Sequence, residues 1–424
     1  MMQCLMIIKT NMIMKDTYKT AFKNLIILEI GDYVSAPYCT KLFADYGANV
    51  IKIEPKEGDS SRKSAPFPND IPNSETSGLY LNLNTNKKSI TLNLDTSDGK
   101  ALFIELIKKS DLLVIDKPSS YLNKIGLPLE LLNKLNSSLI ITHITPFGNN
   151  GPYEDYETND FISFALTNRM SPHGIADGPP LQYGSDVILY QIGTTAAAAS
   201  MAAIFARNKN TKGHLIEISG MEAQIGNVDT RTVFDQYTKR LLQRGSVDLR
   251  YPTGCYPCLD GYIVFGSGED RFFRRLCSAI GKEDLLNDPN WSIPANRESK
   301  QEEFETYLLE WLLVRPKQKV FEICQEYGVM CTPINQIGDL FLDPQLVHRS
   351  YFVKSQHELA GEITYTGAPF RFSKLEWNIS STAPKLSLHT KEILNKFLGV
   401  PVKDLCILKS NAVSYTHLTL PTKA

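Results

Sequence analysis

The fold is decided by residues 26–54, which run IILEIGDYVSAPYCTKLFADYGANVIKIE. Residues 26–30 and 50–54 are short apolar runs rich in isoleucine and valine, and this composition predicts two buried strands. Between them, residues 38–46 are predicted to form a helix that ends at Gly47. Because two parallel strands need a crossover connection, usually a helix, this order predicts the first β-α-β unit of a parallel sheet.

The alternation continues along the first half of the chain. A helix with an acidic first turn is predicted at 98–110. Further strands are predicted at residues 89–94, 112–115, 139–144 and 214–219. Strands that alternate with helices in this way are typical of the α/β class with a mostly parallel sheet.

The second half of the chain has a different pattern and predicts a second, smaller domain. A strand at 262–265 precedes helices at 271–280, 302–314 and 319–327, an arrangement that indicates a small α+β domain. β-structure returns at 363–373, and a helix at 390–398 follows it. In chain order, we expect a non-native or flexible arm at 1–23, the N-terminal part of the large domain at 24–220, a linker and the small domain at 221–333, a return to the large domain at 334–413, and an artefactual tail at 414–424.

Composition excludes several classes of protein. With 42% hydrophobic residues in 424, the chain can bury a sizeable core and is not mainly disordered. The 45 basic and 46 acidic residues almost cancel, which argues against nucleic-acid or membrane-surface binding. Residues 187–206 are uncharged over a length that can cross a bilayer, but their many alanines and scattered polar side chains favour a buried helix.

Short motifs assign no reaction to the chain. The one CxxC, at Cys255 and Cys258, has no second pair at zinc-binding spacing, and the scattered histidines have no metal-ligand spacing, so we predict ordinary thiols and no metal site. The sequence also contains no P-loop, GxGxxG, HExxH or GxSxG motif. A soluble, cytoplasmic α/β enzyme is the expectation at this point.

A longer series of segments is more informative. It comprises Ala36-Pro37, 47–54, 86–92, 147–153, 177–180, Arg207-x3-Thr211-x-Gly213, 218–219, 328–333, 343–345, 367–373 and His389-Thr390. In order and spacing, from about 24 to 413, these segments resemble the class III CoA-transferase family of the CaiB/BaiF type, which includes formyl-CoA, carnitinyl-CoA and succinyl-CoA transferases and α-methylacyl-CoA racemases.

The resemblance implies an architecture and a ligand. It implies a Rossmann-like large domain built from both chain ends, a small domain between them, and two chains that interlock as a dimer. It also implies acyl-CoA and a small carboxylic acid as substrates, with no permanently bound cofactor. Ser35 and Leu92 fall in the CoA-lining segments, and Lys124 stands where the family has an arginine; ordinary packing and a solvated lysine are the alternatives. Lys52, Lys87 and Lys88 are further candidate cations for the CoA phosphates.

The resemblance also implies a mechanism, whose nucleophile is missing. In the family, an aspartate attacks the acyl-CoA thioester and forms a mixed anhydride. The aligned residue here is Leu189, four residues before Gly193. The nearest carboxylate is Asp186, about 4.5 Å earlier along the predicted helix, where it is the candidate nucleophile or, alternatively, the N-cap of that helix.

Three hypotheses remain open from the sequence. The first is a CoA transferase that uses Asp186, and the second is a catalytically silent CoA-binding relative or a non-catalytic subunit that pairs with an aspartate-bearing paralogue. The third is an unrelated Rossmann-type binding protein. Racemase chemistry is disfavoured, because the family's catalytic histidine aligns with Asn159, which cannot exchange protons near neutral pH.

Overall fold

The structure, a computed structural model, describes residues 20–175, 177–184, 186–210, 212–226, 231–239, 244, 252–266 and 269–414. The predicted arm up to residue 19 and the tail from 415 lie outside this range. Two compact units divide the chain: one includes the residues up to Arg244 and those from Tyr351 onward, and the other is Gly245–Ser350. The domain boundaries predicted at 220 and 333 stay a prediction.

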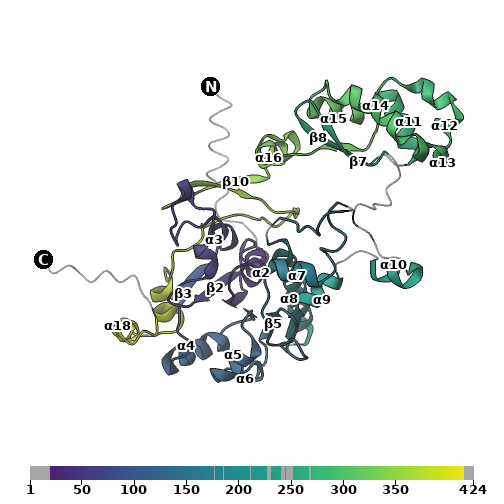
Figure 1. The fold of residues 1–424 in the computed structure, drawn as a ribbon. Helices are drawn as coiled ribbons and strands as arrows, with labels where there is room; N and C mark the ends of the chain where they lie inside the picture. The colour runs from purple at the N-terminus through teal and green to yellow at the C-terminus, as the bar shows by residue number, and fades with distance from the viewer. Residues whose placement is uncertain are drawn as a thin grey trace, which may run out of the picture. The chain divides into compact units, whose positions relative to one another are not determined.

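A six-stranded parallel sheet forms the centre of the first unit and confirms the predicted α/β class (Figure 1). Its strands are β1 (Ile26–Ile30), β2 (Asn49–Glu54), β3 (Lys88–Thr91), β4 (Leu112–Ile115), β5 (Ile140–Thr145) and β6 (Leu215–Ser219). Their spatial order is β3-β2-β1-β4-β5-β6, the order of a doubly wound Rossmann sheet. The direction of winding therefore changes between β1 and β4.

Alternate residues of the central strands bury two separate cores, one on each face of the sheet. Leu28 and Leu113 belong to one core, whereas Ile27 and Leu112 belong to the other. The first face is covered by α4 (Ser97–Lys108), α5 (Ser119–Lys124), α6 (Leu129–Leu135), the π-helical segment Glu392–Phe397 and α18 (Val402–Ser410). The second is covered by α2 (Ser35–Ala44), α7 (Asp160–Leu166) and α8 (Val187–Asn210). Both ends of the described chain thus pack on one sheet, and α18 lies beside α4 in Figure 1.

Helix α8 contains the apolar run noted in the sequence. Its segment Val187–Arg207 is long and apolar enough to cross a membrane, and 44% of the apolar window is buried within the fold. The helix packs closely against α2, because a Cβ atom at Gly193 would lie 2.6 Å from the carbonyl oxygen of Ser35. Glycine at this position therefore allows α8 to approach the first turn of α2 closely.

The remaining elements of the first unit connect or flank this sheet. They are the 3-10 turns Ser60–Lys63 and Pro68–Asp70, α3 (Gly78–Leu83), α9 (Gly220–Gly226), α10 (Arg231–Thr238), and the antiparallel pair β10 (Phe352–His357) and β11 (Gly361–Thr366). The turn Ser60–Lys63 borders the site described below.

The second unit has a small antiparallel sheet with its own core. Its elements are β7 (Gly254–Cys258), β8 (Gly261–Phe265), α11 (Asp270–Ala279), the turns Glu283–Asn287 and Glu298–Lys300, α12 (Pro289–Ser292), α13 (Pro294–Arg297), α14 (Gln301–Leu312), α15 (Lys317–Glu326), β9 (Cys331–Pro333), α16 (Ile337–Leu342) and α17 (Pro344–His348). Phe265, Phe273, Phe304 and Val320 pack in that core. The CxxC cysteines lie on β7, which turns tightly into β8 at the register pair Cys258 and Gly261.

Candidate active site

A cavity of about 840 Å³ opens at the carboxyl ends of the parallel strands. Its wall includes the residues that follow β1, β4, β5 and β6, namely Asp32, Tyr33, Val34, Ser35, Asp116, Lys117, Pro118, Pro146 and Gly220. The start of α8 adds Asp186, Leu189 and Ile192. Ligands of doubly wound sheets bind at this edge, beside the strand pair where the winding reverses. Those strands here are β1 and β4.

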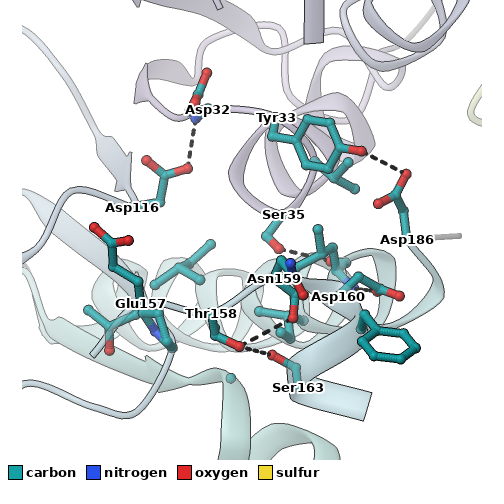
Figure 2. Close-up of a pocket in the computed structure, with 18 of the residues that line it drawn as sticks. Asp32, Tyr33, Ser35, Asp116, Glu157, Thr158, Asn159, Asp160, Ser163 and Asp186 are labelled. Carbon is teal, nitrogen blue, oxygen red and sulfur yellow. Dashed lines mark hydrogen bonds between the residues drawn. The ribbon is translucent and has the colours of Figure 1, made fainter. Parts of the chain in front are cut away.

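Asp186 meets Tyr33 at one side of this cavity. The Tyr33 hydroxyl donates a hydrogen bond to Asp186 Oδ2 at 3.2 Å, and Figure 2 shows the two side chains reaching toward each other. Both residues have a backbone φ of +64°, in the left-handed region that non-glycine residues seldom adopt. Burial raises the pKa of the Asp186 carboxyl, and the hydrogen bond from Tyr33 opposes that rise. Burial and the nearby Asp186 raise the pKa of Tyr33 to about 12.

The N-terminus of α8 is capped by Asp160. Its Oδ1 atom accepts the backbone N–H groups of Ile188 at 2.9 Å and Leu189 at 3.3 Å, and its Oδ2 atom accepts the Gln182 amide at 2.8 Å. Asp186 stands directly before α8, at the N-cap position, and its backbone carbonyl oxygen accepts a helical hydrogen bond. Its side chain turns toward Tyr33, however, and the capping carboxylate comes from α7 instead. Ser185, the residue before Asp186, lies outside the described residues.

The cavity brings together three of the residues predicted from the sequence, namely Ser35, Asp186 and Leu189. The Ser35 hydroxyl donates to the Leu189 carbonyl oxygen at 3.1 Å, which joins the start of α2 to the first turn of α8. Asn159 also lines the cavity, and its side-chain oxygen caps α7 through the N–H of Ile162. A capping amide at that position performs no acid–base chemistry.

Asp116 occupies the opposite side of the cavity from Asp186 in the view of Figure 2. Its Oδ2 atom accepts the backbone N–H of Asp32 at 2.7 Å, whereas its buried Oδ1 atom accepts no hydrogen bond from the described residues. The nearest cation to that oxygen is Lys117 Nζ, at 3.8 Å. Burial raises the pKa of the Asp116 carboxyl to about 7, and Lys117 only partly opposes this rise.

Asp116→Asn is expected to stabilise the protein at pH 8 and to leave its stability near pH 4 unchanged. The raised pKa means that the folded protein retains a proton which the unfolded chain loses at its ordinary value of 3.8. The contribution of Asp116 to the free energy of unfolding is therefore fully present below pH 3.8, and it is lost as the pH rises through about 7. If the carboxyl were fully buried, a pKa shift of this size would destabilise the folded protein at high pH by about 4 kcal/mol. Because the side chain keeps 17% exposure, we expect a gain of about 2 kcal/mol in the free energy of unfolding at pH 8.

Urea unfolding at the two pH values measures this effect. The introduced amide oxygen can still accept the Asp32 N–H, so the loop geometry is preserved. Asp155→Asn, at an exposed carboxylate nearby, is the control and should change nothing at either pH. If the Asp116→Asn protein is only as stable as the wild type at pH 8, ionisation of the Asp116 carboxyl at that pH does not destabilise the folded protein, and the prediction is wrong.

A second cavity of about 620 Å³ adjoins the first and shares Asp32 and Lys117 with it. The predicted Leu92 lies in its wall, together with Lys56 and Lys63 from the loop after β2. Lys124 is exposed at the end of α5 and lines neither of these two cavities.

The prediction that Lys52 and Lys87 are available to phosphates is wrong, because their side chains are completely buried. Lys52 Nζ lies 2.5 Å from Glu29 and 2.6 Å from Asp59, and Lys87 Nζ lies 2.9 Å from Glu29. Lys88 pairs with Glu392 at the edge of the sheet. Burial lowers the pKa of Lys87 to about 8 despite the opposing charge of Glu29. Lys52 and Lys87 are therefore charges of the buried core that line neither cavity.

Sequence reasoning missed Tyr33, Asp160 and Asp116 as members of the site. The sequence singled out Asn159, the residue before Asp160, only as a departure from the family's histidine, and no sequence signal was drawn from Asp116. Nothing in the sequence signals the positive φ of Tyr33, because tyrosine is not a residue that favours it. Within the described residues, no group of three or more His, Cys, Asp or Glu side chains is placed to hold a metal ion.

A parallel doubly wound sheet with a polar cavity at its reversal point defines a Rossmann-class α/β protein. Within that class, the chain belongs to CoA-transferase family III, whose family model matches residues 22–390. The resemblance stated from the sequence is confirmed.

Individual relatives support the same family. Succinyl-CoA:(R)-benzylsuccinate CoA-transferase subunit BbsE of Thauera aromatica is 31% identical over 84% of this chain and 90% of its own length. Succinyl-CoA–D-citramalate CoA-transferase of Chloroflexus aurantiacus is 29% identical over 91% of this chain and 96% of its own. The crystal structure of a CaiB/BaiF family protein from Brucella suis superposes with a TM-score of 0.80 at 25% identity, covering 89% of this chain and 99% of that one.

Proposed function

We propose that this protein transfers CoA between an acyl-CoA and a carboxylic acid, and that the Asp186 carboxylate accepts the acyl group. The observation that carries the proposal is the position of Asp186 in the 840 Å³ cavity of a CoA-transferase family chain. Leu189, at the position of the family's aspartate, lines the same cavity one helical turn later but offers no nucleophile. Asp160 is occupied as the cap of α8, which leaves Asp186 as the carboxylate at that helix start.

The reaction proceeds by exchange of acyl bonds at this carboxylate. An Asp186 oxygen attacks the thioester carbonyl, the C–S bond breaks, and CoA leaves as a thiolate from a mixed anhydride. The thiolate then attacks the aspartyl carbonyl, which releases the donor acid and forms an aspartyl-CoA thioester. The acceptor carboxylate attacks that thioester and expels the CoA thiolate, which leaves a second mixed anhydride. The thiolate then attacks the acceptor's carbonyl carbon, forms the new acyl-CoA and releases the Asp186 carboxylate. Overall one thioester is consumed and one is formed, and Asp186 is regenerated, so no further reactant is required.

We place CoA across the two adjacent cavities. This placement is supported by the positions of Ser35, which lines the first cavity, and Leu92, which lines the second. Lys56, Lys63 and Lys117 line the second cavity and can neutralise the phosphates as point charges. Lys124, exposed on α5, is proposed to meet a phosphate only at the outer end of the ligand.

Isotope exchange and trapping test the proposal. Purified protein with succinyl-CoA, the donor named in the two relatives' titles, should incorporate labelled free CoA into the thioester. Hydroxylamine added during turnover should convert Asp186 to a hydroxamate that mass spectrometry locates in the peptide. Modification at another carboxylate would transfer the role to that residue, and failure to bind CoA would overturn the function itself.

A second candidate function is a non-catalytic subunit of a heteromeric CoA transferase. The observation that favours it is Leu189 itself, together with the name of the Thauera relative, which describes a subunit. On this proposal the protein alone binds CoA without exchange, and activity appears when an aspartate-bearing paralogue is added.

We further propose an interlocked dimer in the cytoplasm, either of two identical chains or with such a paralogue. The family resemblance supports the dimer. The seven cysteines among the described residues are all free thiols, which supports a reducing compartment. Light scattering on the purified chain should give twice the mass of one chain if the homodimer forms.

A further inference from the structure

We propose that Tyr33 is a positioning residue that holds the Asp186 carboxylate in its attacking orientation. The inference rests on the proposed role of Asp186 as the acyl acceptor. It concerns a residue that lies 153 positions earlier in the chain and on a different element, joined to Asp186 by one side-chain hydrogen bond.

Both ends of this hydrogen bond are held in an unfavourable backbone conformation. Tyr33 and Asp186 each have φ of +64°, which brings the Cβ atom of an ordinary residue close to its own backbone. Such residues persist only where surrounding structure imposes them, and they gather at functional sites. Because the side chains of these two strained residues meet at the cavity wall, we infer that the fold maintains the contact between them.

The core beneath the cavity imposes the conformation of Tyr33. Its backbone N–H donates to Asp59 Oδ1 at 3.2 Å, and the other oxygen of Asp59 lies 2.6 Å from the buried Lys52 ammonium. The preceding residue is fixed as well, since the Asp32 N–H donates to Asp116 at 2.7 Å. The backbone around Tyr33 is thus attached to two buried carboxylates, Asp59 and Asp116, which hold the residue at the cavity wall.

The contact leaves one carboxylate oxygen for chemistry. Tyr33 donates to Oδ2, and Asp186 Oδ1 has no hydrogen bond from the described residues. A donor on one oxygen fixes the direction of the other, and a displacement of about 1 Å at a reacting group can cost about 10²-fold in rate. The groups that face the carboxyl are Tyr33 from the loop after β1, Asp160 from α7 and Tyr190 from α8. Of these, Tyr33 donates to the ionised form and keeps it populated, whereas the charge of Asp160 opposes ionisation.

Tyr33→Phe tests this role. We expect kcat to fall about 10²-fold, with KM for succinyl-CoA changed less than about twofold, because the ring that lines the cavity remains. Removal of the donor leaves burial unopposed and raises the pKa of Asp186. The acid limb of the kcat/KM profile should therefore move to higher pH, a shift that a merely structural tyrosine would not produce. Tyr156→Phe, at a tyrosine that is 59% exposed, is the matched control and should change neither quantity.

A second variant guards against misfolding of the first. Tyr33→3-fluorotyrosine keeps the ring and the hydroxyl but makes the hydroxyl a stronger donor, so the acid limb should move to lower pH. Unchanged kcat and unchanged acid limbs in both Tyr33 variants, with Asp186→Asn inactive, would overturn the inference and leave the proposed function standing. An active Asp186→Asn enzyme would instead overturn the role of Asp186, on which the inference rests.

Discussion

Asp186→Asn is expected to abolish CoA transfer, with a fall in kcat on the order of 10⁴-fold, or about 5 kcal/mol in activation free energy. The reason is chemical, because an uncharged amide oxygen does not form an acyl anhydride from a thioester. The side chain keeps its size and can still accept the Tyr33 hydroxyl, so the cavity should be preserved. Exchange of labelled CoA into succinyl-CoA, with CoA affinity measured in parallel, separates lost chemistry from lost binding.

Two further variants make this result specific. Glu157→Gln removes an exposed carboxylate from the same cavity and should retain activity within a few-fold. Asp186→Asn combined with Leu189→Asp places a carboxylate at the family's position, which lines the same cavity, and should restore part of the transfer. Retention of full activity in Asp186→Asn alone would contradict the assignment. If the wild-type chain is inactive by itself and the double variant is active, the result would instead favour the proposal that the protein is a non-catalytic subunit.

Much of the fold was predictable because local signals and global topology agree. The apolar runs at 26–30 and 112–115 become β1 and β4 at the same residues, and the apolar run from Val187 becomes α8. The largest difference near the site is the start of α2, which was predicted at residue 38 and begins at Ser35. Pro37 misled the prediction, although proline is tolerated within the first turn, where its missing N–H has no intrahelical partner.

The site was less predictable because its residues depend on contacts between distant segments. The family pattern pointed to Ser35, Asp186 and Leu189, and the fold places all three around one cavity. Burial of Lys52 could not be foreseen in the same way. A lysine in a strand is ordinarily exposed at an edge, and it is buried here only because the β1–β2 register places it opposite Glu29.

Lys52→Met is expected to lower the free energy of unfolding by about 3–5 kcal/mol at pH 8. Lys52 is completely buried between Glu29 and Asp59, so its removal leaves the buried Asp59 without its ammonium partner and leaves Glu29 with Lys87 alone. Burial raises the pKa values of Glu29 and Asp59, but in the wild type nearby cations outweigh it and lower both: Lys52 for Asp59, and Lys52 together with Lys87 for Glu29. The stabilisation from these carboxylates is therefore present at neutral pH and is lost on acidification through their lowered pKa values.

Denaturant unfolding at two pH values measures the effect and its sign. Without Lys52, burial raises the pKa of Asp59, whose protonated form is then favoured in the folded state, so the deficit should be smaller at pH 5 than at pH 8. Lys56→Met is the matched control, since this nearby lysine is 71% exposed, 3.6 Å from Glu57, and should cost less than about 0.5 kcal/mol. If Lys52→Met lowers the free energy of unfolding at pH 8 by less than about 1 kcal/mol, the result would contradict the role of Lys52 as a buried ion-pair partner, because removal of one such partner ordinarily costs about 3–5 kcal/mol. Since Asp59 also holds the Tyr33 N–H, the same variant should lose CoA transfer even where it remains folded.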